Sequence, residues 1–454
     1  MPVSMNPTDG RVLREYPETP ATEIDRIAEG AHGAFLSWRR QPFSERSRVL
    51  RGVASILKDE RQRLAELMAL EMGKPVRQGR AEVDKCAWVA EFYAEHAERF
   101  LQPELVVTDA AESYVVLQPL GVVLAIMPWN FPFWQVFRFA APALMAGNAG
   151  LLKHASNVSG CALAIEDLFV RAGLPSGLFR TLLVPGSRVG ALIAHPRVAA
   201  VTLTGSTQAG REVGAAAGRA LKKSVLELGG SDPYLILDDA DLDKAAGICA
   251  EGRLVNSGQS CIAAKRFVVV ESVRKAFVDR FVAAMERKVM GDPLLERTDV
   301  GPQARRDLRD ELDEQVRRSV AAGARLVLGG GVPEGPGAYY PPTVLVDVRP
   351  GTPAYDEEIF GPVAAVITAR DEADAVRIAN DSVFGLGAAV LTEDRARGKR
   401  LAETALEAGS CFVNAFVRSD PRLPFGGIKE SGYGRELSAF GIREFVNVKT
   451  VYVA

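Results

Sequence analysis

The segment at residues 255–266, VNSGQSCIAAKR, places Cys261 on a short polar turn that contains a glycine. A helix-like run ends near Val255 and a β-branched run begins at Phe267, so we expect Cys261 at the junction of a helix and a strand. An activated thiol at such a junction can add to an electrophilic carbonyl. The alternative is a structural cysteine, because cysteine often packs as a small buried hydrophobic residue.

Two other polar side chains could support this chemistry. Glu227 ends an apolar run at residues 224–228, and the two glycines that follow leave space beside its carboxylate. A partly buried carboxylate has a raised pKa and can act as a general base. Asn130 can donate a side-chain N–H group to a developing oxyanion. The alternatives are an ion-paired Glu227 and an Asn130 that only stabilises a turn.

Two further sites could contact a nucleotide. Residues 204–210, TGSTQAG, follow a strand-like run and open a helix, so backbone N–H groups and the helix dipole could face a phosphate. The segment matches neither G-x-G-x-x-G nor G-x-x-x-x-G-K-[ST], and a capped strand–helix turn is the alternative. Lys153, at another strand end, could bind nucleotide hydroxyls or phosphate, or could be an ordinary solvated lysine.

Alternating strands and helices must position these residues. After four helices expected between residues 22 and 101, and an exposed strand at 113–117, apolar runs alternate with helix-like segments in the βαβ pattern of a parallel sheet. These runs cover residues 122–127, 150–153, 181–184, 199–204 and 224–228. Parallel sheets bind ligands at the carboxyl ends of their strands, where the candidate residues fall. Runs near 267–270, 326–328, 363–367 and 388–391 predict a second α/β domain, and residues 445–453 a final strand.

Length and composition limit the class of protein. A chain of 454 residues predicts two or three domains, and a net charge of -2 gives no reason to expect nucleic acid or an anionic membrane as a partner. No signal peptide or membrane span is expected. The five cysteines lack a C-x-x-C pair and the four histidines lack metal-ligand spacing, so we expect no metal and a reducing, cytoplasmic location.

Five motifs occur in the order found in the aldehyde dehydrogenase superfamily, which the chain resembles from end to end. They are PWNFP at 128–132, LELGG at 226–230, GQSC at 258–261, EIFGP at 358–362 and PFGG at 424–427. The resemblance implies an α/β fold with a Rossmann-like cofactor-binding domain (1–100 and 120–228), a second α/β catalytic domain (229–417) and a small β oligomerisation flap (101–119 and 436–454). It also implies a homodimer or homotetramer.

The resemblance also implies roles for single residues. Cys261 would be the nucleophile, Asn130 the oxyanion donor and Glu227 the base that activates water. The reaction would oxidise an aldehyde to a carboxylic acid through a thiohemiacetal and a thioester on Cys261, with NADP or NAD as cofactor. The expected cofactor contacts are Trp129, Lys153, Ser156, Gly205, Ser206, Glu358 and Phe360. No basic residue in the motifs is an evident partner for the Cys261 thiolate.

The chain departs from the family at two points. Many members carry Lys-Pro-x-Glu, where the glutamate binds the adenosine ribose, but this chain has Lys153-His154-Ala155-Ser156. Without that carboxylate a 2'-phosphate is not repelled and Ser156 could hydrogen-bond it, so NADP is favoured over NAD. Cys261 also has no nearby cysteine to form a protective disulfide, so oxidation should inactivate it directly.

The substrate prediction rests on similarity to the succinate-semialdehyde branch of the family, at Trp134, Arg138, His154 and residues 418–425. A guanidinium suits a carboxylate, so we place Arg138 on the substrate carboxylate, with a structural ion pair as the alternative. The other expected substrate contacts are Trp134, Ser260, Ser419 and Arg418. The alternatives for function are oxidation of another aldehyde (glutarate semialdehyde, aliphatic or aromatic), a CoA-acylating enzyme, a non-catalytic binding protein on this fold, and a Cys-His hydrolase.

Overall fold

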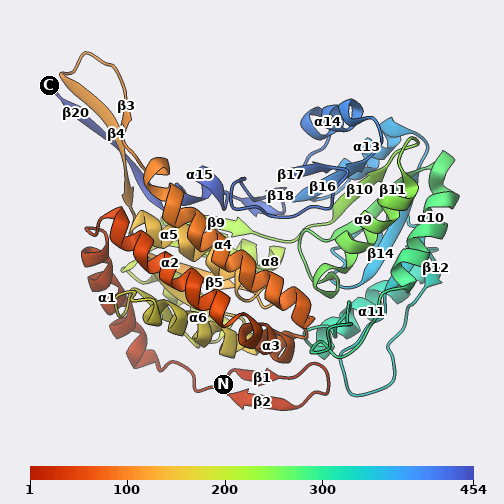
Figure 1. The fold of residues 1–454 in the computed structure, drawn as a ribbon, viewed down its shortest axis with the longest axis horizontal. Coiled ribbons are helices and arrows are strands. Elements are labelled where there is room, and N and C mark those ends of the chain that lie inside the picture. Colours follow the sequence, from red (N-terminus) through yellow and green to blue (C-terminus); the bar gives the residue numbers. More distant parts are fainter.

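The computed structural model describes residues 1–454 and shows two α/β halves side by side, with a β arm projecting from one of them (Figure 1). A six-stranded sheet forms the first half, a seven-stranded sheet the second and a three-stranded sheet the arm, and two strand pairs, β1–β2 and β15–β18, complete the set. The predicted fold class is confirmed. None of the helices combines the length and apolar character that a membrane crossing needs.

A short strand pair and a layer of four helices precede the first sheet. Their elements are β1 (Val3–Met5), β2 (Val12–Glu15), α1 (Ala21–Trp38), α2 (Phe43–Asp59), α3 (Arg61–Met72) and α4 (Val76–Phe100). In α4, Val83, Cys86 and Val89 are fully buried, as their helical spacing predicts. Helix α3 ends at Gly73, whose φ of 77° is left-handed. A side chain there would also lie 2.7 Å from Pro302, so only glycine fits.

The first sheet has the order β19-β9-β8-β5-β6-β7. Its elements are β5 (Val122–Met127), α5 (Trp134–Ala146), β6 (Ala149–His154), η1 (Ser156–Val158), α6 (Ser159–Arg171), β7 (Phe179–Thr181), η2 (Gly186–Arg188), α7 (Val189–Ala194), β8 (Val198–Thr204), α8 (Thr207–Arg219), β9 (Lys223–Glu227) and β19 (Gly432–Tyr433). Strands β5 to β9 are parallel, and their register places Met127 opposite His154 and Thr204 opposite Glu227. The carboxyl ends that carry the candidate residues therefore share one edge of the sheet.

The second sheet has the order β12-β13-β14-β11-β10-β16-β17. Its elements are β10 (Asp232–Ile236), α9 (Leu242–Leu254), η3 (Val255–Gly258), β11 (Ala264–Val270), α10 (Glu271–Glu286), α11 (Arg306–Ala321), β12 (Arg325–Leu328), β13 (Thr343–Val346), α12 (Pro353–Asp356), β14 (Val363–Ala369), α13 (Glu372–Asn380), β15 (Phe384–Gly385), β16 (Gly387–Leu391), α14 (Arg395–Thr404), β17 (Ser410–Val413) and β18 (Ile428–Lys429).

Helices cover both faces of this second sheet. Along β11, Phe267 and Val269 join a core with α9 and α10, whereas Val268 and Val270 join a second core with α11 to α14. A strand buried on both faces needs apolar side chains at every position, which explains the continuous run at 267–270.

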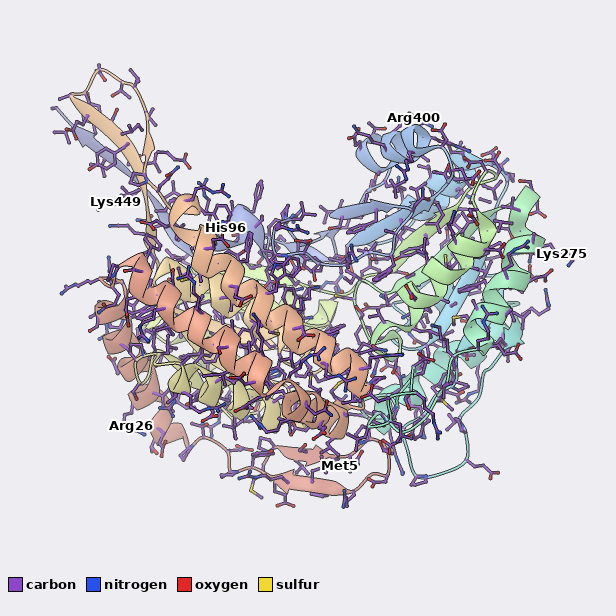
Figure 2. The ribbon with its side chains drawn as sticks, viewed as in Figure 1. Met5, Arg26, His96, Lys275, Arg400 and Lys449 are labelled. Atoms are coloured by element: carbon purple, nitrogen blue, oxygen red, sulfur yellow. The ribbon has the colours of Figure 1, made fainter.

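The arm consists of β3 (Glu104–Leu105), β4 (Glu112–Pro119) and β20 (Val446–Val453), all antiparallel. The C-terminal strand is confirmed and pairs with β4 of its own chain. Figure 1 shows the arm extending away from the body, and Figure 2 places Lys449 on it. Helix α15 (Ser438–Ile442) instead packs against α4 and α5. The boundaries of the three domains stay a prediction.

Some strand predictions were wrong or incomplete. The strand expected at 181–184 ends at Thr181, and β10, β13 and β17 were not predicted. β10 contains Asp232 and Pro233, which are unusual in a central strand, while β13 and β17 each span four residues and give a weak pattern. The glycine-rich stretch at 329–337 forms the loop between β12 and β13.

Candidate active site

A cavity of about 600 Å³ contains Cys261 and Ser260 in its wall. Helices α4 and α5, the segment after α9 and the residues that follow β17 supply most of the wall. Residues expected to contact substrate also line it: Trp134, Arg138, Arg418 and Ser419. The structure thus brings together side chains that are more than 280 positions apart in the sequence, at one opening that leads to the thiol.

The turn before Cys261 has an unusual backbone. Asn256, Ser257 and Gly258 have consecutive left-handed φ angles of 52°, 55° and 77°. A side chain at position 258 would lie 2.2 Å from the backbone of Gly361, so glycine is required. Hydrogen bonds hold the strained turn in place. In one of them the backbone N–H of Gly301 donates to Ser257 Oγ at 2.9 Å. It orients Cys261 between η3 and β11, as predicted from the sequence.

Asn130 lies against the same turn. Its Nδ2 donates to the carbonyl oxygen of Gln259 at 3.1 Å, and Asn256 Nδ2 donates back to the Asn130 carbonyl at 2.7 Å. The PWNFP and GQSC motifs are therefore linked in space. One Nδ2 hydrogen of Asn130 has no partner, and the backbone N–H of Cys261 makes no hydrogen bond. These are two donors of the kind that an oxyanion site requires.

Lys265 was not recognised as a functional residue in the sequence. Only 1% of its surface is exposed, and its Nζ donates to the carbonyl oxygens of Cys261 at 2.8 Å and Ser260 at 3.0 Å. Nζ also lies 3.6 Å from Glu358 Oε1. A lysine at the buried start of an apolar strand was the available signal, because such a charge needs partners. Lys265 therefore fixes the backbone that carries the thiol.

The Cys261 thiol is a weak acid in this structure. Burial raises its pKa to about 12, and the charges of Arg138 and Lys265 lower it only in part. Glu358 and Glu227 act in the opposite direction. The charges of these two residues favour the thiolate, but the unliganded thiol remains protonated at neutral pH.

Glu227 ends β9 and is 2% exposed, and neither carboxylate oxygen has a hydrogen-bond partner. Burial raises its pKa well above the ordinary value, Arg138 partly offsets this, and the Glu436 carboxylate adds to the increase. A side chain on Gly426 would lie 2.7 Å from Glu227 Oε1, so glycine leaves the carboxylate room. The environment suits a proton acceptor whose pKa is raised above that of an ordinary carboxyl group.

Arg138 is already paired. Its Nε forms an ion pair with Glu436, Nη2 donates to Thr204 Oγ1 at 3.3 Å, and the guanidinium lies 4.5 Å from the ring centre of Phe425. The ion pair that was the alternative from sequence is therefore present. Nη1 makes no hydrogen bond, and Arg138 lines the cavity, so a role on the substrate carboxylate stays a prediction.

The expected cofactor contacts lie at the sheet edge and beside it. Ser206 caps α8, since its Oγ accepts from Ala209 N at 3.3 Å, and the N-terminus of this helix is suited to phosphate. Lys153 is half-buried, has no ion-pair or hydrogen-bond partner, and has a pKa lowered by burial. Ser156 is exposed at the start of η1. A second cavity, of about 590 Å³, lies between α7 and α8.

Two more candidate contacts lie beside the turn that carries Cys261. The ring of Trp129 meets that of Phe360 edge-on at 5.8 Å. Glu358 Oε1 accepts from Gly230 N at 2.9 Å, which joins the EIFGP and LELGG motifs. A lysine without an ion-pair partner and a helix N-terminus fit a phosphate-bearing dinucleotide. No group of three or more His, Cys, Asp or Glu side chains is arranged to hold a metal ion.

Comparison with known proteins defines the class. The model of the aldehyde dehydrogenase family matches residues 3–451, so the chain belongs to this family. It is 50% identical over 451 residues to a probable NADP+ succinate-semialdehyde dehydrogenase of Synechocystis sp., covering 99% of each chain. It is 47% identical over 450 residues to the NAD(P)+ succinate semialdehyde dehydrogenase Sad of Escherichia coli, covering 99% of this chain and 97% of that one.

Solved structures agree with this assignment. The succinic semialdehyde dehydrogenase of Streptococcus pyogenes, determined in complex with NADP+, superposes with a TM-score of 0.97 at 36% identity, covering 100% of both chains. The aldehyde dehydrogenase fold expected from the five motifs is therefore confirmed, including the parts of the chain between them.

Proposed function

We propose that this aldehyde dehydrogenase oxidises succinate semialdehyde to succinate with NADP or NAD as the hydride acceptor. Relatives that are 47% and 50% identical over nearly their whole length carry this activity in their names. The observation that carries the proposal is the shared cavity, in which Cys261 lies with the cationic side chains of α4 and α5. An aldehyde that bears a carboxylate suits such a wall.

The residues have separate tasks in this reaction. The Cys261 thiol releases its proton to solvent and the sulfur adds to the aldehyde carbon, while Asn130 Nδ2 and the Cys261 N–H hold the oxygen, which becomes the alkoxide of the thiohemiacetal. The chemistry supplied by a bound nicotinamide is hydride acceptance, which takes the adduct on Cys261 from thiohemiacetal to thioester. Glu227 then takes a proton from the water that hydrolyses the thioester, and Lys265 keeps the loop in position throughout.

Initial rates test the substrate assignment. We expect kcat/KM for succinate semialdehyde to exceed that for glutarate semialdehyde, butanal and benzaldehyde by at least about tenfold. The rates are measured as the increase in NAD(P)H absorbance. An equal or higher value for one of the other three would assign the enzyme to that aldehyde. Absence of NAD(P)H with every aldehyde would leave the non-catalytic alternative.

For the cofactor, we propose that Lys153, Ser156, Gly205, Ser206, Trp129, Glu358 and Phe360 form the contacts. Lys153 and Ser156 lie near the start of η1 with no carboxylate at position 156, which favours a 2'-phosphate and hence NADP over NAD. The ratio of kcat/KM with the two cofactors measures this preference.

We also propose a cytoplasmic homodimer or homotetramer that associates through the arm. The arm carries apolar side chains in solvent, notably Val107 in the loop between β3 and β4, which is 100% exposed, Leu105 on β3 and Val448 on β20. β3 and β20 are the edge strands of this small sheet, and exposed edge strands with apolar side chains are usual interface elements. Light scattering after gel filtration measures the mass, and deletion of residues 446–454 should yield a smaller species. A monomeric full-length chain would contradict the proposal.

A further inference from the structure

Lys85 is a half-buried cation of the cavity that lacks a counter-ion. It lies on α4, is half-buried and lines the cavity that contains Cys261. Its Nζ donates to Ser419 Oγ at 2.7 Å and lies 4.3 Å from the ring centre of Trp134. No carboxylate pairs with it. The ammonium is therefore held in place by one hydroxyl and one aromatic face, both part of the cavity wall.

The carboxylates closest to Lys85 are engaged elsewhere. Asp420 accepts from Arg422 Nε at 2.9 Å and from Nη2 at 2.7 Å. Glu82 forms a buried ion pair with Lys74, and its Oε1 accepts from the backbone N–H of Phe133 and Trp134, at 2.9 Å each. Because both acids have partners of their own, neither forms an ion pair with Lys85.

The other cations of the cavity differ from Lys85. Arg138 is paired with Glu436 and bonded to Thr204, and Arg77 is paired with Asp299. Arg418 is exposed to solvent. Lys288 is half-buried and has no ion-pair partner. It lies where the cavity wall adjoins another pocket, which is lined by residues of α9 and of the end of α10. A half-buried ammonium without a counter-ion is costly, and an anion entering the cavity would relieve that cost.

We propose that the Lys85 ammonium, together with the Ser419 hydroxyl, binds the carboxylate of an ω-carboxylated aldehyde substrate and sets the preference over neutral aldehydes. This inference rests on the proposed function and deepens it. Sequence analysis assigned the substrate carboxylate to Arg138 and did not include Lys85. In this proposal Lys85 is the main cation that binds the carboxylate. Arg138, whose Nη1 makes no hydrogen bond, is a second cation in the same cavity wall.

The charges around Lys85 give it a second signature. Burial and the neighbouring Arg138 lower the pKa of Lys85 to about 8, while Cys86, Asp420 and Glu82 partly oppose this. The ammonium form is needed to bind a carboxylate, so binding of the product succinate should weaken as the pH rises through about 8. An arginine anchor would keep its charge over this range.

The kinetic test uses Lys85→Met, which keeps the stem against Trp134 and removes the charge. We expect the ratio of kcat/KM for succinate semialdehyde to that for butanal to fall about 10- to 100-fold, mainly through KM, and Lys85→Arg to restore part of it. Ser419→Ala should lower the ratio about three- to tenfold. This substitution removes only a hydroxyl group and leaves no large void in the packing. The matched control, Lys288→Met, should change the ratio less than about twofold.

The outcomes separate the two proposals. A wild-type enzyme without preference for succinate semialdehyde over butanal overturns the proposed function and this inference together. A preference that survives in Lys85→Met and Ser419→Ala overturns this inference alone. An equal loss for both aldehydes with a lowered melting temperature shows a structural lysine and also overturns it. Competitive inhibition by succinate from pH 6.5 to 9.5 should weaken above about pH 8 in the wild type and stay flat in Lys85→Met.

Discussion

Lys265 Nζ donates a hydrogen bond of 2.8 Å to the carbonyl oxygen of Cys261, four positions earlier in the chain. The proposed nucleophile thus depends on a buried ammonium for the position of its backbone, and on the same charge for part of its acidity. The link also reaches Glu358, through the ion pair that Lys265 makes there. The catalytic turn and the expected ribose contact therefore share one cation.

Replacing Lys265 tests this link. Lys265→Met should lower kcat by at least about 100-fold, because the turn loses its hydrogen bonds and Glu358 is left buried without its cation. Alkylation of Cys261 by iodoacetamide at pH 8 should also slow, since a charge that favours the thiolate is gone. Retained alkylation and turnover would show that the backbone strain alone positions Cys261.

The pH dependence of alkylation tests the state of the thiol. With the pKa of Cys261 raised to about 12 by burial, the iodoacetamide rate should rise about tenfold per pH unit from pH 7 to 9 without a plateau. A cysteine with an ordinary pKa near 8.5 would level off in the upper part of that range. A plateau below pH 8 would mean that Arg138 and Lys265 outweigh burial. Cys261→Ser identifies the modified residue.

Glu227→Gln should separate acylation from deacylation. The variant keeps the shape of the side chain but cannot accept a proton, so steady-state turnover should fall about 10²- to 10⁴-fold. One NAD(P)H per active site should still form in a rapid burst, because the thioester accumulates. Loss of the burst as well would place Glu227 in the first half of the reaction.

Glu227 also affects stability. Its folded pKa is raised well above the ordinary value, so at pH values between the two the folded chain holds a proton that the unfolded chain has released. The free energy of unfolding should therefore fall as the pH rises through this range. Glu227→Gln lacks this dependence. Its melting temperature should therefore fall less between pH 5.5 and pH 7.5 than that of the wild type.

Arg138 requires a double variant. Arg138→Met leaves Glu436 buried without its cation and should destabilise the protein by about 3–5 kcal/mol. Adding Glu436→Gln should restore most of this. In the double variant, KM for succinate semialdehyde should rise more than KM for butanal if Nη1 contacts the carboxylate. Equal changes would leave Arg138 a purely structural role.

Ser156→Glu tests cofactor choice. A carboxylate at this exposed position should repel a 2'-phosphate and accept the ribose hydroxyls of NAD instead. We expect the NADP to NAD ratio of kcat/KM to fall at least about tenfold, while KM for the aldehyde stays nearly constant. A strong NAD preference of the wild-type enzyme, unchanged in Ser156→Glu, would contradict the NADP assignment.

The class of fold and the main chemical groups could be predicted from local patterns in the chain. The alternation of apolar runs and helical segments predicts parallel strands, and the strand at 122–127 matches β5 at both ends. Cys261, Glu227 and Asn130 lie near turns at strand ends, and the resemblance of the five motifs to the aldehyde dehydrogenase family predicts their roles. These signals are local, since backbone periodicity and turn residues act over a few positions.

Which charges remain free depends on long-range packing that local patterns do not reveal. Sequence could not show that Glu436 pairs with Arg138, or that Lys85 of α4 meets Ser419, because 298 and 334 positions separate these residues. It likewise could not show that Lys265 folds back onto the carbonyl of Cys261. The pKa and binding capacity of a buried charge depend on every neighbour that packs around it, and packing joins segments that are distant in the chain.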